Sequence, residues 1–412
     1  MANFRIAIIG AGPAGCTLAK LLIQANINVT IFEGETSPDV RSQGGTLDLH
    51  PNSGLAALRE AGLYDEFLKH ARFDGGALKV TDKRLKEYIS IPGTKEGSSH
   101  ARPEIDRESL RKLLYESLPA DTIRWGFRLK SVSDDLTLHF EQCNLGGFDL
   151  IVGADGAWSR VRPLLTDMQP HYVLLGGFRY KISDPENRFP DLYKLVNRGS
   201  IFSYSDHRSL TVQQMGDGSL SCGEWATRDE SWDKAQDFDI NDSKAVKAFL
   251  LNEYRDWSPE HLKFIEMADD ASFIYRRLYM LPNGHSWENR PGVTLVGDAA
   301  HLTVPFSGQG VNLAMEDSLN LAHAIIEAEK QHSETALITK VKSFEDNMFK
   351  RAKKVQERSF GNMQDMFFTE GAPRTVIERY IIRDIQSQAG PIFSSVAAIL
   401  VYVSYWFYKL VY

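Results

Sequence analysis

A glycine-rich turn near the N-terminus constrains the fold of this chain more than any other feature. Residues 5–9, RIAII, form a short apolar run typical of a buried strand, and a helical segment extends to about Ala25. Between them stand Gly10, Gly12 and Gly15 with the spacing GxGxxG. The first glycine permits a tight turn, the second lets the backbone approach a pyrophosphate, and the third lets helix and strand pack closely. The segment therefore predicts the β-α-β opening of a dinucleotide-binding fold, with phosphate at the helix N-terminus.

An acidic residue ends the next predicted strand. The run Val29–Glu33 has strand character, and Glu33 follows Gly10 by 23 residues. In dinucleotide-binding folds an acid at about this distance accepts a hydrogen bond from a ribose hydroxyl. Because a carboxylate there favours a free ribose 2′-OH, the sequence indicates FAD or NAD rather than NADP at this site.

The rest of the chain predicts an α/β protein with an insertion. Two further apolar runs, Phe148–Ala154 and Val293–Gly297, lead into Asp-Gly and Gly-Asp pairs. Between them, residues 170–285 alternate polar and apolar side chains, which is typical of an antiparallel sheet. Helical patterns follow over 312–329 and, as a long helix, over 340–368.

The expected architecture is a Rossmann-like nucleotide-binding domain, an inserted, mostly antiparallel β-sheet domain for the substrate, and a long C-terminal helix. A length of 412 residues suits two or three domains. The expected boundaries are 1–170 with 286–335 for the nucleotide-binding domain, 171–285 for the substrate domain, 336–370 for a bridging helix and 371–412 for an apolar tail.

Net charge and cysteine content argue against several classes of protein. The formal net charge is −7, whereas a nucleic-acid binder usually carries a basic balance, so no nucleic-acid partner is expected. The three cysteines, Cys16, Cys143 and Cys222, lie far apart without a CxxC pair. They argue against a disulfide scaffold or a zinc site, and they fit a reducing, cytoplasmic compartment. No metal-ligand cluster is visible.

The C-terminal tail suggests contact with a membrane. Ala389–Tyr408 contains no charged residue, and Lys409 follows it. About 20 apolar residues can span a bilayer as a helix, and upstream Arg374, Arg379 and Arg383 would keep the main body in the cytosol. A tail buried against the globular body, or one lying in the membrane interface, explains the same pattern. A tail that spans the membrane is therefore one of three alternatives, and two of the three associate residues 389–412 with a membrane.

Two further segments suggest contacts with a nucleotide. Arg107 stands in the first turn of its predicted helix, where a cation opposes the helix dipole, and Arg111 lies four residues on, on the same face. A dinucleotide phosphate facing them would offset this cost; a solvent-exposed arginine is the alternative. Asp298 follows an apolar run and could accept hydrogen bonds from a polyol. Downstream, Gly308 and Gly310 would let backbone N–H groups reach a flat ring.

Together these segments resemble the class A flavoprotein monooxygenases, the FAD- and NAD(P)H-dependent aromatic hydroxylase superfamily. Its signatures stand in order as GAGPAG at 10–15, DLIVGADGAWSRVR at 149–162 and GVTLVGDAAHLTVPFSGQGVNLAMED at 292–317. Within the superfamily the chain looks most like the tetracycline-inactivating monooxygenases, through segments 44–63, 102–114 and 246–258 and the long C-terminal helix. The apolar tail is extra to that subfamily and is similar to the hydrophobic segments of membrane-associated fungal natural-product monooxygenases.

The resemblance implies a set of cofactor-binding residues and assigns no catalytic side chain. The ADP half of FAD would lie on the glycine-rich turn, Arg107 would contact the FAD linker, and Asp155 would serve both FAD and NADPH. Lys194 and Ser221 stand where the tetracycline enzymes carry a glutamine and a histidine against the drug, which is a departure from that pattern. The implied cofactor-binding residues are Gly10, Gly12, Ala14, Gly15, Glu33, Arg41, Asp48, Arg107, Asp155, Asp298, Pro305, Gly308, Gly310, Val311 and Asn312.

The implied activity is insertion of one oxygen atom, through a C4a-hydroperoxyflavin, into an electron-rich phenol, enol or alkene. NADPH and O2 would be co-substrates, and the substrate would be a small aromatic, polycyclic or tetracycline-like compound acted on by a monomeric enzyme. An FAD-dependent oxidase or dehydrogenase is one alternative, and a halogenase is disfavoured because the WxWxIP signature is absent. A non-catalytic binding protein that kept the nucleotide fold is another alternative, although the intact PFSGQG loop argues against it.

Overall fold

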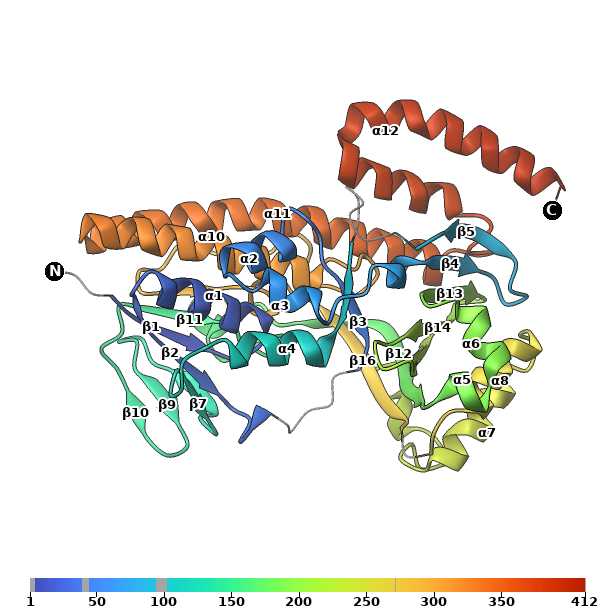
Figure 1. Cartoon of the computed structure of the whole chain (residues 1–412), viewed down its shortest axis with the longest axis horizontal. Coiled ribbons are helices and arrows are strands. Elements are labelled where there is room, and N and C mark those ends of the chain that lie inside the picture. Colours follow the sequence, from blue (N-terminus) through green and yellow to red (C-terminus); the bar gives the residue numbers. More distant parts are fainter. Residues whose placement is uncertain (1–3, 39–43, 94–101, 271, 412) are drawn as a thin grey trace. The chain divides into compact units, whose positions relative to one another are not determined.

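The chain divides into two compact units. The computed structural model describes residues 4–38, 44–93, 102–270 and 272–411, with the backbone alone for 387–396 and 411. The first unit comprises Met1–Ala71, Ile105–His171 and Tyr279–Gln356, and the second comprises Arg72–Glu104, Tyr172–Leu278 and Glu357–Tyr412 (Figure 1). Residues 72–104 belong to the second unit because β4 (Leu78–Thr81) pairs with β13 (Ser200–Ser205), whereas the sequence analysis assigned them to the nucleotide-binding domain.

A parallel five-stranded sheet forms the centre of the first unit. Its order is β17-β11-β1-β2-β7, with all four neighbouring pairs parallel. Because the β1 and β11 side chains are almost all buried, these strands read as continuous apolar runs in the sequence. The bounds are β1 Arg5–Ile9, β2 Asn28–Glu33, β7 Ile123–Trp125, β11 Leu150–Gly153 and β17 Val293–Leu295.

Helices pack around this sheet. The helices α1 (Pro13–Gln24) and α10 (Gly310–Gln331) lie against each other, and the Ser318 hydroxyl donates to the Ala14 carbonyl at 2.8 Å. Small strands complete the unit as a three-stranded sheet, β10-β9-β8, and a two-stranded sheet, β3-β6. The remaining elements are β3 Thr46–Asp48, β6 Glu104–Asp106, β8 Leu129–Val132, β9 Leu138–Phe140, β10 Asn144–Leu145, α2 Gly54–Glu60, α3 Tyr64–Leu68, α4 Arg107–Glu116 and α9 Asp298–His301. The long helix α11, Glu334–Phe368, begins in this unit, and its residues from Glu357 on belong to the second.

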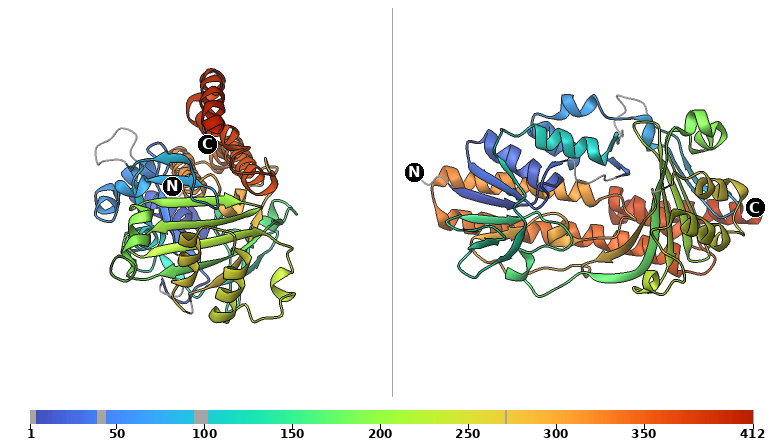
Figure 2. Two further views of the ribbon diagram at one scale, coloured as in Figure 1. Left: turned by 90° about the vertical axis from the view of Figure 1, so that its right-hand side faces the viewer. Right: turned by 90° about the horizontal axis from the view of Figure 1, so that it is seen from below.

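The second unit is built on a seven-stranded mixed sheet of order β16-β12-β15-β14-β13-β4-β5 (Figure 2). One face packs against helices, and its core includes Leu210, Val212 and Cys222 from the sheet with Leu250 and Phe264 from the helices. The additional elements are β5 Glu87–Ile91, β12 His171–Ile182, β14 Arg208–Gln214, β15 Leu220–Thr227, β16 Ile274–Met280, α5 Pro185–Arg188, α6 Pro190–Val196, α7 Ser243–Glu253 and α8 Pro259–Glu266. Short 3-10 helices occupy Asp74–Gly76, Arg162–Leu164 and Trp232–Lys234.

The predicted α/β fold class is confirmed. Residues 5–9 form β1 as predicted, and the alternating segment 170–285 forms antiparallel pairs among β12 to β15. The predicted long helix begins earlier, at Glu334, and ends at Phe368 as expected. Local pattern predicts these elements well because one face of each must be buried.

The tail forms helix α12 (Ile377–Val411), which folds back on itself in Figure 1. Within the residues that the structure describes, no helix combines the length and apolarity needed to cross a membrane.

A buried histidine ties α8 to the sheet of the second unit. The His261 side chain is enclosed, with Nε2 2.7 Å from the Ser203 hydroxyl on β13 and Nδ1 3.0 Å from the Ser258 hydroxyl that precedes α8. Burial lowers the pKa of His261 from its usual 6.5 to about 4, because the imidazolium would lose its hydration. The folded protein thus holds this ring neutral at pH values where an unfolded chain protonates it.

We expect His261 to make the second unit acid-sensitive. Since its folded pKa lies below its unfolded pKa, its contribution to stability is complete above about pH 6.5 and is lost as the pH falls toward 4, by about 3 kcal/mol at most. Urea unfolding of wild type and His261→Gln at pH 7.5 and 5 measures this, and the variant should lose less stability on acidification. The exposed His171→Gln is the matched control. Equal pH dependence in wild type and His261→Gln would contradict the assignment.

Candidate functional site

The glycine-rich turn has the geometry that a phosphate site requires. Gly10 has φ +106°, and a Cβ added there would lie 2.5 Å from the Ala154 carbonyl oxygen, so a larger residue meets both strain and collision. A Cβ added at Gly15 would lie 2.0 Å from the Gly10 carbonyl oxygen. At Gly12, the N-cap of α1, an added Cβ meets nothing within 4 Å. The space beside Gly12, at the N-terminus of α1, is therefore open, and a helix N-terminus is where a phosphate is favoured.

Glu33 is fixed at the edge of this turn. It ends β2, and its carboxylate accepts the Ala11 N–H at 2.7 Å through Oε2 and the Glu35 N–H at 2.9 Å through Oε1. Each oxygen keeps a further lone pair, so the carboxylate can still accept a hydroxyl. This arrangement suits the predicted ribose contact.

Asp155 follows β11 and carries a polar atom with no partner. Its Oδ2 accepts the Arg160 N–H at 2.7 Å, whereas its Oδ1 is buried and accepts no hydrogen bond within the described part of the chain. Burial raises the pKa of Asp155 above its usual value, and the Arg160 N–H and the charge of Arg162 oppose the rise. An orphaned buried acceptor of this kind indicates a missing donor, such as a hydroxyl of a bound nucleotide.

A buried arginine connects Asp155 with Asp298. The Arg162 side chain is 1% exposed, and it donates to the Ala299 carbonyl at 2.8 Å and to the Ala157 carbonyl at 2.6 Å. Asp298, the first residue of α9, reaches solvent but is crowded by protein atoms. This desolvation raises its pKa, although His301, Arg107 and Arg162 oppose the rise. The Asp-Gly and Gly-Asp motifs thus share one cation.

The side-chain amide of Asn312 holds the start of α10 against the end of β3 and the turn that follows it. The Asn312 side chain is fully buried; its Oδ1 accepts the His50 N–H at 2.8 Å and the Ser53 hydroxyl at 3.2 Å, and its Nδ2 donates to the Asp48 carbonyl at 2.8 Å. The His50 ring lies between the Asp48 carboxylate, 2.8 Å from Nε2, and the Gln309 amide, 3.2 Å from Nδ1. These bonds bring the predicted flavin-side residues Asp48 and Asn312 together.

The loop that precedes α10 is open to solvent. An added Cβ at Gly310 would meet nothing within 4 Å, and Gly308 has φ +66°. The hydroxyls of Thr303 and Ser307 are buried without a hydrogen-bond partner among the described residues. Exposed backbone and these two hydroxyls therefore stand in the loop that leads into a 22-residue helix, and at the N-terminus of that helix the dipole favours negative charge. The predicted residues here are exposed or half-buried: Pro305, Gly308, Gly310 and Val311.

These features fit FAD. The open space at Gly12 suits a pyrophosphate, the carboxylates of Glu33, Asp155 and Asp298 suit hydroxyl donors, and the open backbone at Gly310 suits a planar ring. Comparison with known proteins decides the family. The model of the FAD binding domain family matches residues 3–171 and 286–359, which is more than half of the chain.

The chain is a class A FAD-dependent monooxygenase by family. It is 30% identical to monooxygenase penA of Penicillium thymicola over 90% of this chain and 97% of that protein. It is 27% identical to 6-hydroxynicotinate 3-monooxygenase of Pseudomonas fluorescens over 87% of this chain and 91% of that protein. The crystal structure of tetracycline destructase Tet(55) covers 94% of this chain and 98% of its own, with a TM-score of 0.69 and 18% identity. That last likeness shows a shared fold alone.

Of the three arginines expected near the cofactor, one remains available to it, one does not, and one lies outside the described residues. Arg107 is exposed at the start of α4, and its positive charge opposes the rise in the pKa of Asp298. Arg111, expected to face the same anion, instead forms a buried ion pair with Glu35 and is not available to a phosphate. Arg41 lies outside the described residues.

The two predicted substrate residues do not lie together. Lys194 is exposed on α6, which packs over the sheet face lined by Leu210 and Val212. Ser221 alternates with the buried Cys222 of β15 and therefore points to the opposite face, where its hydroxyl lies 3.4 Å from an Arg179 nitrogen. One binding site in this unit cannot include both side chains.

Sequence reasoning missed Arg162 as a site residue. It lies in the DLIVGADGAWSRVR motif, seven positions after Asp155, but the presence of a charged residue in a motif does not show that its side chain turns inward. His301 beside the same site is 2.5 Å from Asp317 through Nε2, and both side chains are buried. Asp317 also pairs with Arg351 at 3.0 Å, so His301 has a positioning role for α9 against α10.

Proposed function

We propose that this flavoprotein takes electrons from NADPH and inserts one atom of O2 into an electron-rich phenol, enol or alkene of a polycyclic or tetracycline-like compound. The balance is one substrate C–H (or C=C), one O2, one NADPH and one proton giving hydroxylated or epoxidised product, water and NADP⁺. The names of the relatives support the reaction class, since penA is a monooxygenase and the Pseudomonas fluorescens protein acts on an aromatic ring.

The observation that carries this proposal is the locked, solvent-open N-terminus of α10. When bound, FAD supplies the oxygen-activating chemistry that protein side chains lack. The chain's own part is to hold the ring on the open backbone of Gly308 and Gly310 and to offset negative charge on it with the N–H groups of α10. The Asn312 amide keeps these donors in place, because its three hydrogen bonds fix the helix start against β3. A protein that only carried a ligand would have no need of this loop.

We propose that the substrate contacts the sheet face on which Ser221 lies. Around it stand half-buried polar side chains from neighbouring strands, including Thr211 and Gln213 of β14, at the register positions opposite Gly223 and Ser221. Hydroxyl and amide groups of this kind orient a substrate that bears phenol or carbonyl oxygens. Lys194 lies on the other side of the sheet, so this proposal does not include it among the substrate contacts.

We expect Asp298→Ala to weaken FAD binding by about 10- to 100-fold, because a hydrogen bond to a charged acceptor contributes about 1.5–3 kcal/mol. The free energy of unfolding of the apo protein should stay the same or increase, because desolvation disfavours the charged form of the Asp298 carboxylate. Substrate-stimulated NADPH oxidation, with product gaining one oxygen atom by mass, should be lost at limiting FAD. The exposed Asp237→Ala is the matched control.

The same assay separates the alternatives. Purified protein with added FAD is mixed with phenolic, tetracycline-like and terpenoid compounds, and NADPH consumption is compared with oxygen incorporation. A yellow protein that oxidises substrate without NADPH would be an oxidase. A protein that never takes up FAD would be a carrier, and either result would overturn the monooxygenase proposal.

A further inference from the structure

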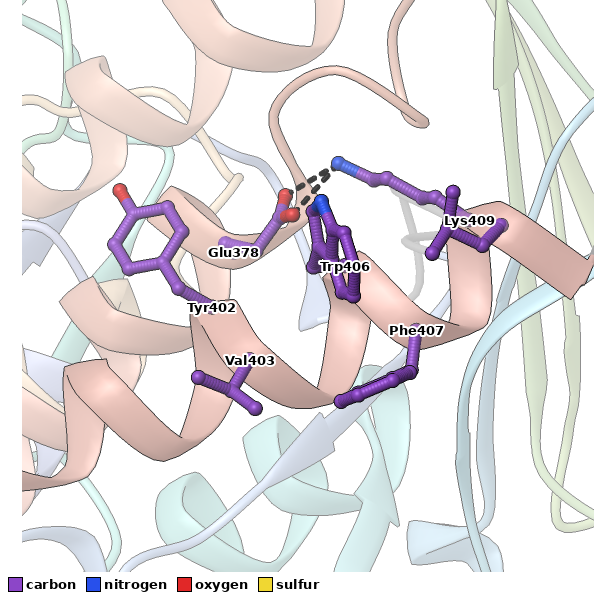
Figure 3. Close-up of a pocket in the computed structure, with 7 residues that line it drawn as sticks. Glu378, Tyr402, Val403, Trp406, Phe407 and Lys409 are labelled. Atoms are coloured by element: carbon purple, nitrogen blue, oxygen red, sulfur yellow. Dashed lines mark hydrogen bonds and ion pairs between the residues drawn. The ribbon is translucent and has the colours of Figure 1, made fainter.

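Exposed apolar side chains concentrate on the last part of α12. Of the thirteen large apolar residues that are exposed in the described part of the chain, seven lie between Ile399 and Leu410, and each of these seven is at least half exposed. Leu400 and Leu410 are 68% and 64% exposed. At 100° per residue these seven positions occupy one arc of the helix. Five of the seven, from Tyr402 to Leu410, line a hollow of about 670 Å³ together with Glu378 and Lys409 (Figure 3).

The opposite side of this helix is held by the second unit. The Tyr405 hydroxyl donates to the Tyr88 carbonyl of β5, and the Tyr408 hydroxyl donates to the Glu87 carbonyl at 2.6 Å. The Lys409 ammonium lies 2.7 and 2.8 Å from the two Glu378 carboxylate oxygens. The helix is therefore held in place, and these contacts set which face points outward.

This orientation is the reverse of what water favours. An amphipathic helix on a water-soluble surface buries its apolar stripe and exposes its hydroxyls, because burial of apolar area is favourable by about 25 cal/mol per Å². Here Tyr405 and Tyr408 turn their hydroxyls to the protein, and Val403 and Phe407 turn outward. The outward face requires an apolar neighbour.

The chemistry of the face favours lipid over protein as that neighbour. A protein interface carries about one hydrogen bond per 100–200 Å² and a polar rim. Among the seven side chains of this face, the Tyr402 hydroxyl and the Trp406 N–H are the only polar groups. Tryptophan and tyrosine beside an apolar stripe are typical of the membrane–water interface, and the run Ala389–Tyr408 has no charge. We propose that this face of α12 lies on the surface of a lipid bilayer, parallel to its plane, without crossing it.

The test uses the full chain with FAD bound and vesicles of phosphatidylcholine. Wild type should float with the vesicles, and the triple variant Val403→Ser, Phe407→Ser, Leu410→Ser should lower the vesicle–water partition coefficient at least tenfold. Because these side chains are exposed, the variant should keep the FAD absorbance and thermal midpoint of wild type. The double variant Leu174→Ser, Ile274→Ser, about half exposed and far from α12 in the sequence, should bind vesicles as wild type does.

Two results would overturn the proposal. One is a wild-type protein that stays with the vesicle-free fraction. The other is a triple variant that floats as well as wild type. If light scattering shows concentration-dependent dimers that the triple variant loses while no form of the protein floats, the face is a contact between two copies and the lipid proposal is wrong. None of these readouts depends on catalytic turnover.

Discussion

Gly12→Val should weaken FAD binding at least about 100-fold, or about 2.7 kcal/mol, and leave the apo protein as stable as wild type. A side chain at this position meets no protein atom within 4 Å, and the backbone, at φ −80° and ψ −179°, accepts any L residue. The valine would instead occupy the open space at the N-terminus of α1, where the pyrophosphate is expected. Quenching of FAD fluorescence on titration with apo protein measures the loss.

Two further glycine variants make the result specific. Gly146→Val, on an exposed loop where an added Cβ makes an ordinary 3.5 Å contact, should bind FAD as wild type does. Gly10→Ala should lose both stability and FAD, because its φ of +106° and the 2.5 Å approach to the Ala154 carbonyl exclude a Cβ. If Gly12→Val retained FAD with wild-type affinity, the phosphate could not lie at this turn.

The parts of the site that the sequence could predict are those set by local requirements. Gly10, Gly12 and Gly15 differ in the space around them as the GxGxxG spacing requires, because a strand–turn–helix leaves little choice of geometry. The apolar runs around Asp155 and Asp298 place both residues at the carboxyl ends of parallel neighbouring strands, β11 and β17. Such positions follow from pattern alone.

The parts that the sequence could not predict depend on distant partners. Arg111 has the charge and spacing of a phosphate ligand, yet it pairs with Glu35, 76 residues away. Asn312 binds the backbone of Asp48 and His50 across more than 260 residues. Strand β4 joins the second unit through β13, which no local pattern indicates. In each case tertiary contacts select one of several partners that local chemistry allows.

The orientation of α12 is another feature that the sequence could not predict. Its uncharged run indicates an apolar environment, and bilayer, interface and protein core all satisfy that pattern. The hydroxyls of Tyr405 and Tyr408 distinguish these alternatives, because their carbonyl partners on β5 determine which side of the helix the protein covers. Composition therefore predicted the kind of surface, and only the tertiary contacts give its direction.

Arg162→Met should destabilise the native state by about 3–5 kcal/mol, the cost typical of removing one partner from a buried charge cluster. The change would leave the carbonyls of Ala157 and Ala299 without donors. It would also remove the cation that opposes the raised pKa values of Asp155 and Asp298, so both would rise further. Urea unfolding of the apo protein measures the cost.

The pH dependence of this loss identifies its cause. A carboxyl group whose folded pKa lies above its unfolded pKa destabilises the native state while charged, and protonation relieves the penalty as the pH falls. The deficit of Arg162→Met should therefore be larger at pH 7.5 than at pH 5. Arg160→Met, two residues away and exposed, should change stability by no more than about 0.5 kcal/mol. A deficit that is independent of pH would mean that Arg162 acts through its carbonyl partners alone, and the shared-cation link between the two motifs would then be wrong.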